Sequence, residues 1–217
     1  GEVLISIAST QPATCAFTDV VWTNGRVNES TTFTLNFANA STNQVVLTRC
    51  VLDKKFFSTS PAGLKFANCY IHNKWSVGGN TLWAGIEDSF VRSPGDFSAT
   101  NGSVKRCFLY QDAPASGNPH GLSPPTGPTA GSNIEWIDNY YYFNGAAAAG
   151  EAFFASTAST AHTLTVSRNL ILPNSAGLCS GALMASNGSV NAGFRIVCEH
   201  NTVWIAGHSG LEIGHLY

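Results

Sequence analysis

Short stretches of alternating apolar and polar residues run along the chain, and several share one pattern. In each stretch, two apolar residues are separated by one position, and a small polar or thiol residue stands three positions after the second of them. A further apolar residue stands two positions after the small residue. Four stretches show this pattern without gaps: 45–52, 64–71, 83–90 and 102–109. Their small residues, here called anchors, are Cys50, Cys69, Asp88 and Cys107, each 19 residues after the last. The chain therefore contains an internal repeat.

Three further copies continue the repeat at longer spacing. The copies and their anchors are 134–141 with Asn139, 164–171 with Asn169 and 196–203 with Asn201. An earlier copy at 15–22 places Val20 at the anchor position, 30 residues before Cys50. Apolar residues at every second position are typical of a strand with one buried face. Each copy thus predicts a strand, a corner at the anchor and a second strand.

Stacking of the copies explains how such short strands are stabilised, because a repeat of this size cannot bury an apolar face alone. Stacked strands lie about 4.8 Å apart, so the anchors of successive copies come to lie above one another and their side chains form a ladder. Asn suits a corner because it tolerates the left-handed backbone region and hydrogen-bonds locally. We therefore expect an all-β fold in which the anchors occupy equivalent corners with their side chains inward.

This strand–corner–strand pattern with Asn and Cys anchors resembles the right-handed parallel β-helix of pectate-lyase-like proteins and phage tailspikes. The resemblance covers 45–217 and reaches Cys15 if the earlier copy is included. It implies a single domain over 1–217, a solenoid of about eight coils that is open at one or both ends. Residues 1–44 form its less regular N-terminal coil or coils, and 210–217 start another coil.

Known members of this superfamily also suggest where such a protein works. They imply an extracellular, virion or cell-surface location and a polysaccharide or cell-surface glycan as partner. Many tailspikes are trimers, so the resemblance also implies a homotrimer or a part of a longer chain or assembly.

Composition excludes some other partners. Charged residues make up 11% of the 217 residues and the formal net charge is −2, which argues against a nucleic-acid partner held by phosphate neutralisation. The longest apolar runs fall short of the ~20 residues that a membrane-spanning helix needs, so no membrane span is expected.

The residues directly before the anchors form a predicted outward column of nearly alternating charge. They are Arg49, Asn68, Glu87, Arg106, Asp138, Arg168 and His200. The resemblance implies lyases that use carboxylates with a metal ion and a basic residue, and glycosidases that use paired carboxylates. Glu87, Arg106 and Asp138 are therefore the candidate catalytic residues. The alternative is a surface ion-pair ladder, which contributes little to stability.

Aromatic residues gather just after the anchors. One column holds Tyr70, Phe108 and Tyr140, and a second holds His72, Tyr110, Tyr142 and Trp204. Aromatic rings offer flat apolar faces on which sugar rings stack, so Tyr110, His120, Tyr142 and His72 are the candidate substrate-binding residues. His120 lies in the Pro- and Gly-rich stretch 112–131, which is predicted to loop out beside the candidate catalytic residues. The alternatives are packing under a loop and a subunit interface.

The six Cys and six His do not indicate a metal site. The sequence contains no Cys-x-x-Cys, which excludes a zinc ribbon, and the His residues share no metal-binding spacing. Cys50 and Cys69 fall in adjacent coils, near bonding distance. Reduced thiols are the expected state, because Cys packs well as a small buried residue. No cofactor is predicted, with a structural or catalytic calcium ion as the open alternative.

Two functions of different classes follow. The first is an extracellular polysaccharide-binding β-helix, with a polysaccharide lyase or glycoside hydrolase as its catalytic form. The second is a non-catalytic structural shaft or adhesin segment of a viral or phage tail spike or fibre, or of a bacterial surface protein. The aromatic columns and the Pro-rich loop favour the first function, and the low charge with many small polar residues favours the second.

Overall fold

The computed structural model describes residues 3–7, 14–22, 32–37, 44–52, 55–59, 63–71, 76–77, 83–92, 101–112, 132–144, 151–155, 162–173, 181–185, 195–203 and 209–213. Every regular element in these ranges is a β-strand, and the strands form four sheets. All strand pairings are parallel, for example β5 with β8 and β16 with β19.

Two sheets of eight strands form the main body. Sheet I contains β2 (Thr14–Thr18), β5 (Gln44–Thr48), β8 (Gly63–Ala67), β11 (Trp83–Glu87), β13 (Asn101–Lys105), β15 (Ser132–Ile137), β18 (His162–Ser167) and β21 (Arg195–Glu199). Sheet II contains β3 (Val21–Trp22), β6 (Val51–Leu52), β9 (Tyr70–Ile71), β12 (Phe90–Arg92), β14 (Phe108–Asp112), β16 (Tyr140–Asn144), β19 (Leu170–Pro173) and β22 (Thr202–Val203).

Two smaller sheets complete the set of strands. Sheet III contains β1 (Val3–Ile7), β4 (Thr32–Phe37), β7 (Lys55–Thr59) and β10 (Ser76–Val77). Sheet IV contains β17 (Glu151–Ala155), β20 (Gly181–Ala185) and β23 (Ser209–Ile213).

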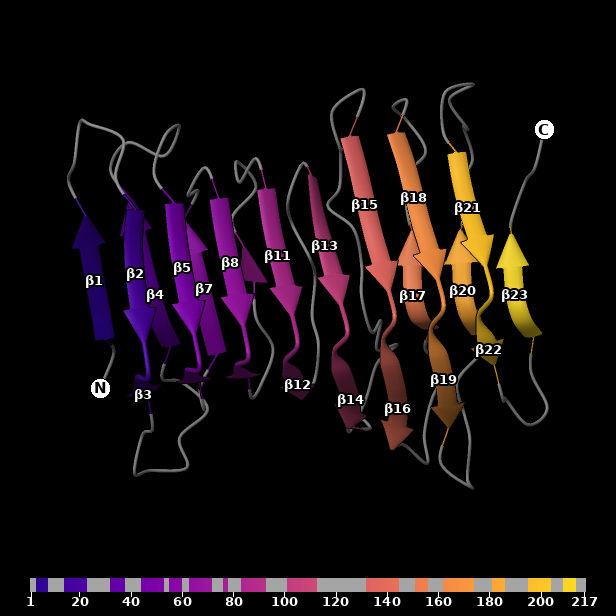
Figure 1. Ribbon diagram of the computed structural model, residues 1–217, viewed down its shortest axis with the longest axis horizontal. Coiled ribbons are helices and arrows are strands. Elements are labelled where there is room, and N and C mark those ends of the chain that lie inside the picture. Colours follow the sequence, from indigo (N-terminus) through magenta and orange to yellow (C-terminus); the bar gives the residue numbers. More distant parts are fainter. Residues whose placement is uncertain are drawn as a thin grey trace.

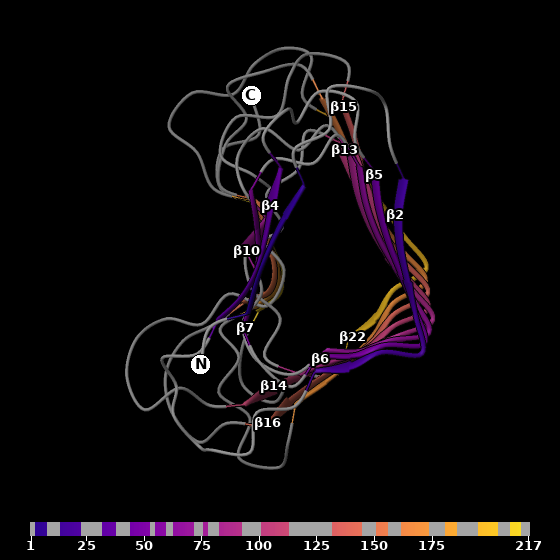
Figure 2. The ribbon, with the colours of Figure 1, turned by 90° about the vertical axis from the view of Figure 1, so that its left-hand side faces the viewer.

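Neighbouring strands in each sheet follow one another in chain order, with strands of the other sheets between them. The strands of sheet I lie side by side along the long axis, and the N- and C-terminal strands lie at opposite ends (Figure 1). Viewed along that axis, sheets I and II meet at a sharp corner, and sheet III lies on the opposite side (Figure 2). The predicted all-β, parallel architecture is confirmed, and it is compatible with a parallel β-solenoid.

Apolar residues at alternate positions fill the space between the sheets. Leu47, Phe66, Ile86, Val104, Trp136 and Val166 are in register on neighbouring strands of sheet I. Each of them is at most 1% exposed. From sheet II, Leu52, Ile71, Val91, Leu109, Tyr141 and Ile171 face the same core and are at most 3% exposed. The period-two pattern of the sequence therefore buries one face of each strand.

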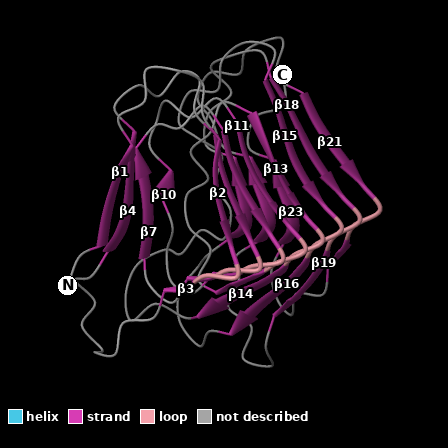
Figure 3. Cartoon of the chain, turned by 60° about the vertical axis from the view of Figure 1, so that its left-hand side comes forward, coloured by secondary structure: helices cyan, strands magenta, loops and turns pink. Residues whose placement is uncertain are grey.

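A single residue with a left-handed backbone makes each corner between sheets I and II, and the corners line up along the stack (Figure 3). These corner residues have φ between 50° and 58° and are Asp19, Arg49, Asn68, Asp88, Arg106, Asp138, Arg168 and His200. We expected the left-handed residue to be the anchor itself. In every coil except that of Asp88 it is instead the residue before the anchor, so that its side chain projects into solvent while the anchor side chain faces the core.

The residue after each corner residue forms the predicted inward ladder. Asn139 and Asn169 are 2% and 1% exposed, and Cys50, Cys69 and Cys107 are 1% to 3% exposed. Asn139 N–H donates to Asn169 Oδ1 (2.9 Å), and Asn169 N–H donates to Asn201 Oδ1 (2.9 Å). These six residues are therefore confirmed as ladder residues.

The seventh predicted anchor, Asp88, is wrong. Ser89 occupies the ladder position, 5% exposed, where its Oγ accepts from Cys69 N–H (3.0 Å) and donates to Glu87 O (2.7 Å). Asp88 is an outward corner residue. The coil that contains β11 is therefore shifted by one residue relative to the gap-free alignment.

Candidate functional site

The corner residues form a charged column on the outside of the stack, and their charges are paired between neighbouring coils. Arg106 donates through Nε to Asp88 Oδ1 (2.7 Å) and through Nη2 to Asp88 Oδ2 (2.8 Å). Arg168 contacts Asp138 in the same way, at 2.6 and 2.9 Å. A third pair joins Arg49 to Asp19 at 2.6 and 2.8 Å. Each pair therefore has the two-pronged geometry of the strongest guanidinium–carboxylate contacts.

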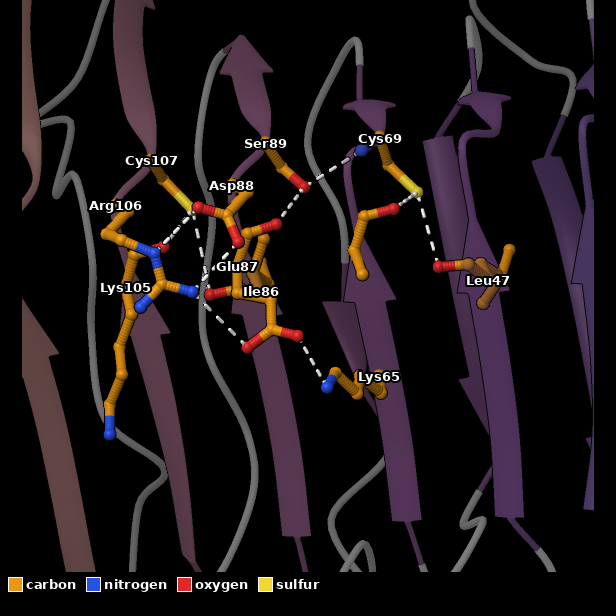
Figure 4. A network of polar contacts seen from close by, with 11 residues as sticks. Leu47, Lys65, Cys69, Ile86, Glu87, Asp88, Ser89, Lys105, Arg106 and Cys107 are labelled. Atoms are coloured by element: carbon orange, nitrogen blue, oxygen red, sulfur yellow. Dashed lines mark hydrogen bonds and ion pairs between the residues drawn. The ribbon is translucent and has the colours of Figure 1, made fainter.

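Glu87 lies outside this column, contrary to the sequence-based alignment. It is the last residue of β11 and is in register with Lys105, not with Arg106. Its carboxylate contacts Lys65 Nζ at 2.5 Å and Arg106 Nη2 at 3.6 Å (Figure 4). The one-residue shift of its coil explains the error, because Asp88 takes the corner position that the alignment gave to Glu87.

The three candidate catalytic residues are therefore close in space, but each has a partner. Arg106 contacts both Asp88 and Glu87. Asp138 lies one coil further along the corner column, with Arg168 as its partner. The side chains of Glu87, Arg106 and Asp138 are 33%, 49% and 38% exposed, so they lie on an open surface. The structure places Glu87 and Arg106 in one ion-pair cluster with Asp88, and Asp138 in a separate pair with Arg168.

The electrostatics of the column oppose the function of a general acid. The guanidinium of Arg168 lowers the pKa of Asp138 by hydrogen bonding, and Arg106 lowers the pKa of Asp88 in the same way. A carboxyl that protonates a glycosidic oxygen needs the opposite shift, a raised pKa. Asp138 is therefore held as an ionised carboxylate.

A second surface feature is an aromatic column on the outward side of sheet II. Tyr70, Phe90, Phe108 and Tyr140 are in register on β9, β12, β14 and β16. Their ring centroids are 5.2 Å apart for Tyr70 and Phe90, 5.2 Å for Phe90 and Phe108, and 4.8 Å for Phe108 and Tyr140. The rings thus follow one another along the axis at about the strand spacing; Tyr70 and Phe90 are parallel within 3°, whereas Phe90 and Phe108 are tilted by 41°.

Phe90 is the member of this column that the sequence reasoning missed. The gap-free alignment put Ser89 at this position, because Ser89 follows the wrongly chosen anchor Asp88. The signal that identifies Phe90 is the apolar alternation. A one-residue shift of the alignment in this coil places Ile86 and Val91 at the inward positions, and they are 1% and 0% exposed. With that shift Phe90 follows the ladder residue directly, as Tyr70 follows Cys69.

The candidate substrate-binding residues are only partly placed. Tyr110 and Tyr142 lie next to each other on β14 and β16, with ring centroids 5.8 Å apart. The guanidinium of Arg92 lies 5.8 Å from the centroid of Tyr110. His72 and His120 lie outside the described residues, as do Trp204 and most of the stretch 112–131. The predicted meeting of that loop with the charged column stays a prediction.

The thiols of the ladder act as hydrogen-bond donors to the backbone. Cys50 Sγ donates to Thr48 O (3.4 Å), Cys69 Sγ to Ala67 O (3.3 Å) and Cys107 Sγ to Lys105 O (3.2 Å). Burial raises the pKa of Cys107 to about 12. The chemistry of these groups is that of packed thiols, because a thiolate is the reactive form.

Neither a metal site nor a membrane helix is found in the part of the chain that the structure describes. No three His, Cys, Asp or Glu residues in these ranges gather as metal ligands would. No helix there has the length and apolar character needed to cross a membrane.

No family model matches the chain, and neither a curated protein nor a solved structure does.

Proposed function

We propose that this chain is a right-handed parallel β-helix whose function is structural: a rigid, non-catalytic shaft or adhesin segment of an extracellular, virion or cell-surface protein. Connections between parallel strands of one sheet are right-handed in about 98% of cases, which supports the handedness. The low content of charged residues, 11%, and the many small polar residues support a stack that works through its shape.

The observation that carries this proposal is the pairing of the corner charges. Arg49, Arg106 and Arg168 each make two hydrogen bonds to the Asp at the preceding corner. A carboxyl group that acts as a general acid has to be protonated before it reacts, and a pKa lowered by a bidentate guanidinium opposes this. The repeated pairs are typical of a surface that links one coil to the next.

The aromatic column supports the same proposal. A sugar stacks on an aromatic ring through the face of the ring. Phe90 and Phe108 each have neighbouring rings along the axis on both sides, with ring centroids 4.8 to 5.2 Å away, and each has one neighbour stacked on it: Tyr70 on Phe90 and Tyr140 on Phe108. The stacked rings therefore contribute to cohesion between coils more than to a platform for sugars.

An assay for polysaccharide cleavage tests the proposal. The purified chain is incubated with a panel of neutral, acidic and amino polysaccharides, and new reducing ends and unsaturated uronic acids are measured. We expect no turnover. Turnover by the chain that disappears in both Glu87→Gln and Asp138→Asn would refute the non-catalytic role and restore the catalytic function of the charged column. Asp19→Asn, which changes the same kind of pair at the far end of the column, is the matched control.

Polysaccharide binding without catalysis is the second candidate function. The observation that favours it is the Tyr110–Tyr142 pair on the outward side of sheet II, with Arg92 beside it. A glycan array probed with the chain tests it. If sugars stack on these rings as nucleic-acid bases stack on aromatic residues, Tyr110→Ala and Tyr142→Ala should each weaken binding by about 1–3 kcal/mol. An array without any bound glycan rejects this candidate and leaves the structural function standing.

A further inference from the structure

Cys50 and Cys69 occupy the ladder positions of two adjacent coils. The residues that follow them, Val51 and Tyr70, are in register on β6 and β9. Tyr70 N–H donates to Cys50 O (2.9 Å), which joins the two coils at this point. Neighbouring strands lie about 4.8 Å apart, and the two Cα atoms of a disulfide lie about 4.4–6.8 Å apart. The backbone therefore holds the two cysteines at a spacing that a disulfide can bridge.

The two thiol side chains also lie next to each other. Both are buried in the core, at 1% and 3% exposure. Cys69 Sγ donates to Leu47 O of the preceding coil (3.4 Å) and thus leans toward the coil of Cys50 (Figure 4). Burial raises the pKa of Cys69, and a hydrogen bond with the Cys50 side chain is among the further causes that raise it. Cys50 Sγ donates to Thr48 O (3.4 Å) and to Phe17 O (3.5 Å), so a turn about its Cα–Cβ bond, away from Phe17, brings the two sulfur atoms together.

The other described cysteines lack such a neighbour. Ser89 fills the ladder position between Cys69 and Cys107, where its Oγ accepts from Cys69 N–H (3.0 Å). Cys69 and Cys107 are thus two coils apart, about 9.6 Å at the strand spacing. Cα atoms more than about 7 Å apart cannot be bridged without movement of the backbone. Cys15 and Cys198 lie within β2 and β21, away from the ladder positions. Among the described residues, one pair of thiols is therefore placed for a disulfide.

The geometry points to Cys50 and Cys69 as an oxidative modification site, at which a disulfide joins two neighbouring coils of the stack. The oxidant is a small-molecule disulfide. One protein thiolate attacks a sulfur of this molecule, which forms a mixed disulfide and releases one small thiol. The second protein thiolate attacks the protein sulfur of the mixed disulfide and releases the other small thiol. The protein pair loses two electrons, and its two thiol protons pass to the two released thiols.

The burial of the pair decides when the bond forms. In the closed stack both residues are thiols, and burial suppresses the reactive thiolate form. A chain whose coils are still assembling exposes the same two thiols to the oxidant. Once formed, the disulfide limits the freedom of the unfolded chain between two residues that are 19 positions apart, and this stabilises the folded stack. The inference goes beyond the proposed structural function and does not depend on it.

Loss of the two thiol hydrogens costs the corner little. The thiols of Cys50 and Cys69 donate to Thr48 O and Ala67 O. Each of these carbonyls keeps a backbone donor from a neighbouring coil: Asp19 N–H donates to Thr48 O (3.1 Å), and Arg49 N–H donates to Ala67 O (3.0 Å). A disulfide is uncharged and carries no donor that would need a partner. Oxidation therefore leaves neither carbonyl unsatisfied.

Refolding under controlled redox conditions tests the inference. The full chain is reduced, unfolded in urea and refolded in a buffer of reduced and oxidised glutathione. Remaining thiols are blocked with a maleimide, and the chain is digested without reduction and mapped by mass spectrometry. We expect a cross-linked pair of peptides that contain Cys50 and Cys69, and two fewer maleimide-reactive thiols in urea than the reduced chain has. A chain that stays folded in the same buffer should form this cross-link more slowly.

Two variants separate this pair from the rest of the ladder. Cys107→Ser is the matched control, because Cys107 is a ladder thiol of similar burial, 2% exposed, with Ser89 and Asn139 as its ladder neighbours. The cross-link should persist in Cys107→Ser and disappear in Cys50→Ser. Urea unfolding followed by circular dichroism measures the effect on the stack. The oxidised chain should unfold at a higher urea concentration than the same chain after reduction with dithiothreitol, and Cys50→Ser should show no such difference.

Three results would overturn the inference. The first is a refolded chain that regains its β-sheet spectrum without a bond between Cys50 and Cys69. The second is a set of cross-links spread in equal yield over the other cysteines, which would show that the stack does not select this pair. The third is an oxidised chain that is no more stable than the reduced chain. Polysaccharide turnover would refute the proposed structural function and changes none of these readouts, so the two failures are distinguishable.

Discussion

Replacement of Asn169 by Leu tests whether the ladder stabilises the stack. Asn169 is 1% exposed. Its Oδ1 accepts from Asn139 N–H (2.9 Å) and Nδ2 (3.0 Å), and its Nδ2 donates to Trp136 O and Asn201 Oδ1, both at 2.9 Å. Leu has a similar size and forms none of these bonds. The two Asn139 donors then stay buried without an acceptor, each at a cost of about 1–3 kcal/mol.

Burial of the Leu side chain returns part of this free energy, so we expect the free energy of unfolding to fall by about 2–5 kcal/mol. Urea unfolding followed by circular dichroism measures the change, with the slope of the transition checked against that of the original chain. Thr165→Leu, on the outward side of the same strand β18, is the matched control and should change stability by less than about 0.5 kcal/mol. Equal effects of the two substitutions would refute the role of the ladder.

Three further predictions concern the surface pairs, the thiols and the aromatic column. Arg106→Gln should raise the pKa of Asp88 toward its usual range, measured by carboxyl NMR titration. Because the pKa of Asp88 is lower in the folded protein than in the unfolded chain, the Arg106–Asp88 pair stabilises the fold at pH values above the unfolded-state pKa of Asp, about 4. This contribution is lost as the pH falls through the pKa that Asp88 has in the folded protein. Thiol-labelling with a maleimide, mapped by mass spectrometry, should modify Cys198 before the buried Cys107, which reacts only on unfolding. Phe90→Leu keeps apolar area but removes the ring contacts with Tyr70 and Phe108, and should lower stability by about 1–3 kcal/mol in urea unfolding; an unchanged midpoint would contradict this.

The strands and their parallel stacking are predictable from the sequence because each copy repeats the same apolar alternation. The error lies in one coil. The ladder residues Cys69, Ser89 and Cys107 are 20 and 18 residues apart, whereas a constant spacing of 19 selects Asp88. The apolar pattern contains the correct answer, because only the Ser89 register turns Ile86 and Val91 inward. Burial, and not regular spacing, determines the register of a strand.

The backbone of the corners is less predictable. Left-handed conformations favour Gly, Asn and Asp, yet Arg49, Arg106 and Arg168 adopt them here. Their N–H groups donate to carbonyls of the next coil at 2.9 to 3.0 Å, so the stack compensates for the unfavourable backbone. This hydrogen bond connects distant parts of the chain, and propensities of single residues do not contain it.

The corner charges are better explained by the order of the coils than by their contribution to stability. Exposed ion pairs stabilise a fold only weakly, and these side chains are exposed. The column nevertheless avoids like charges at neighbouring corners, since Asp88, Arg106, Asp138 and Arg168 alternate in sign. If the coil of Arg106 were left out of the stack, Asp88 would meet Asp138, and without the coil of Asp138 two guanidinium groups would meet. Because the Asn and thiol ladder is similar from coil to coil, it discriminates poorly between such misalignments. The alternating charges supply the missing discrimination, and this explains why six of the eight corner residues are charged in a weakly charged chain.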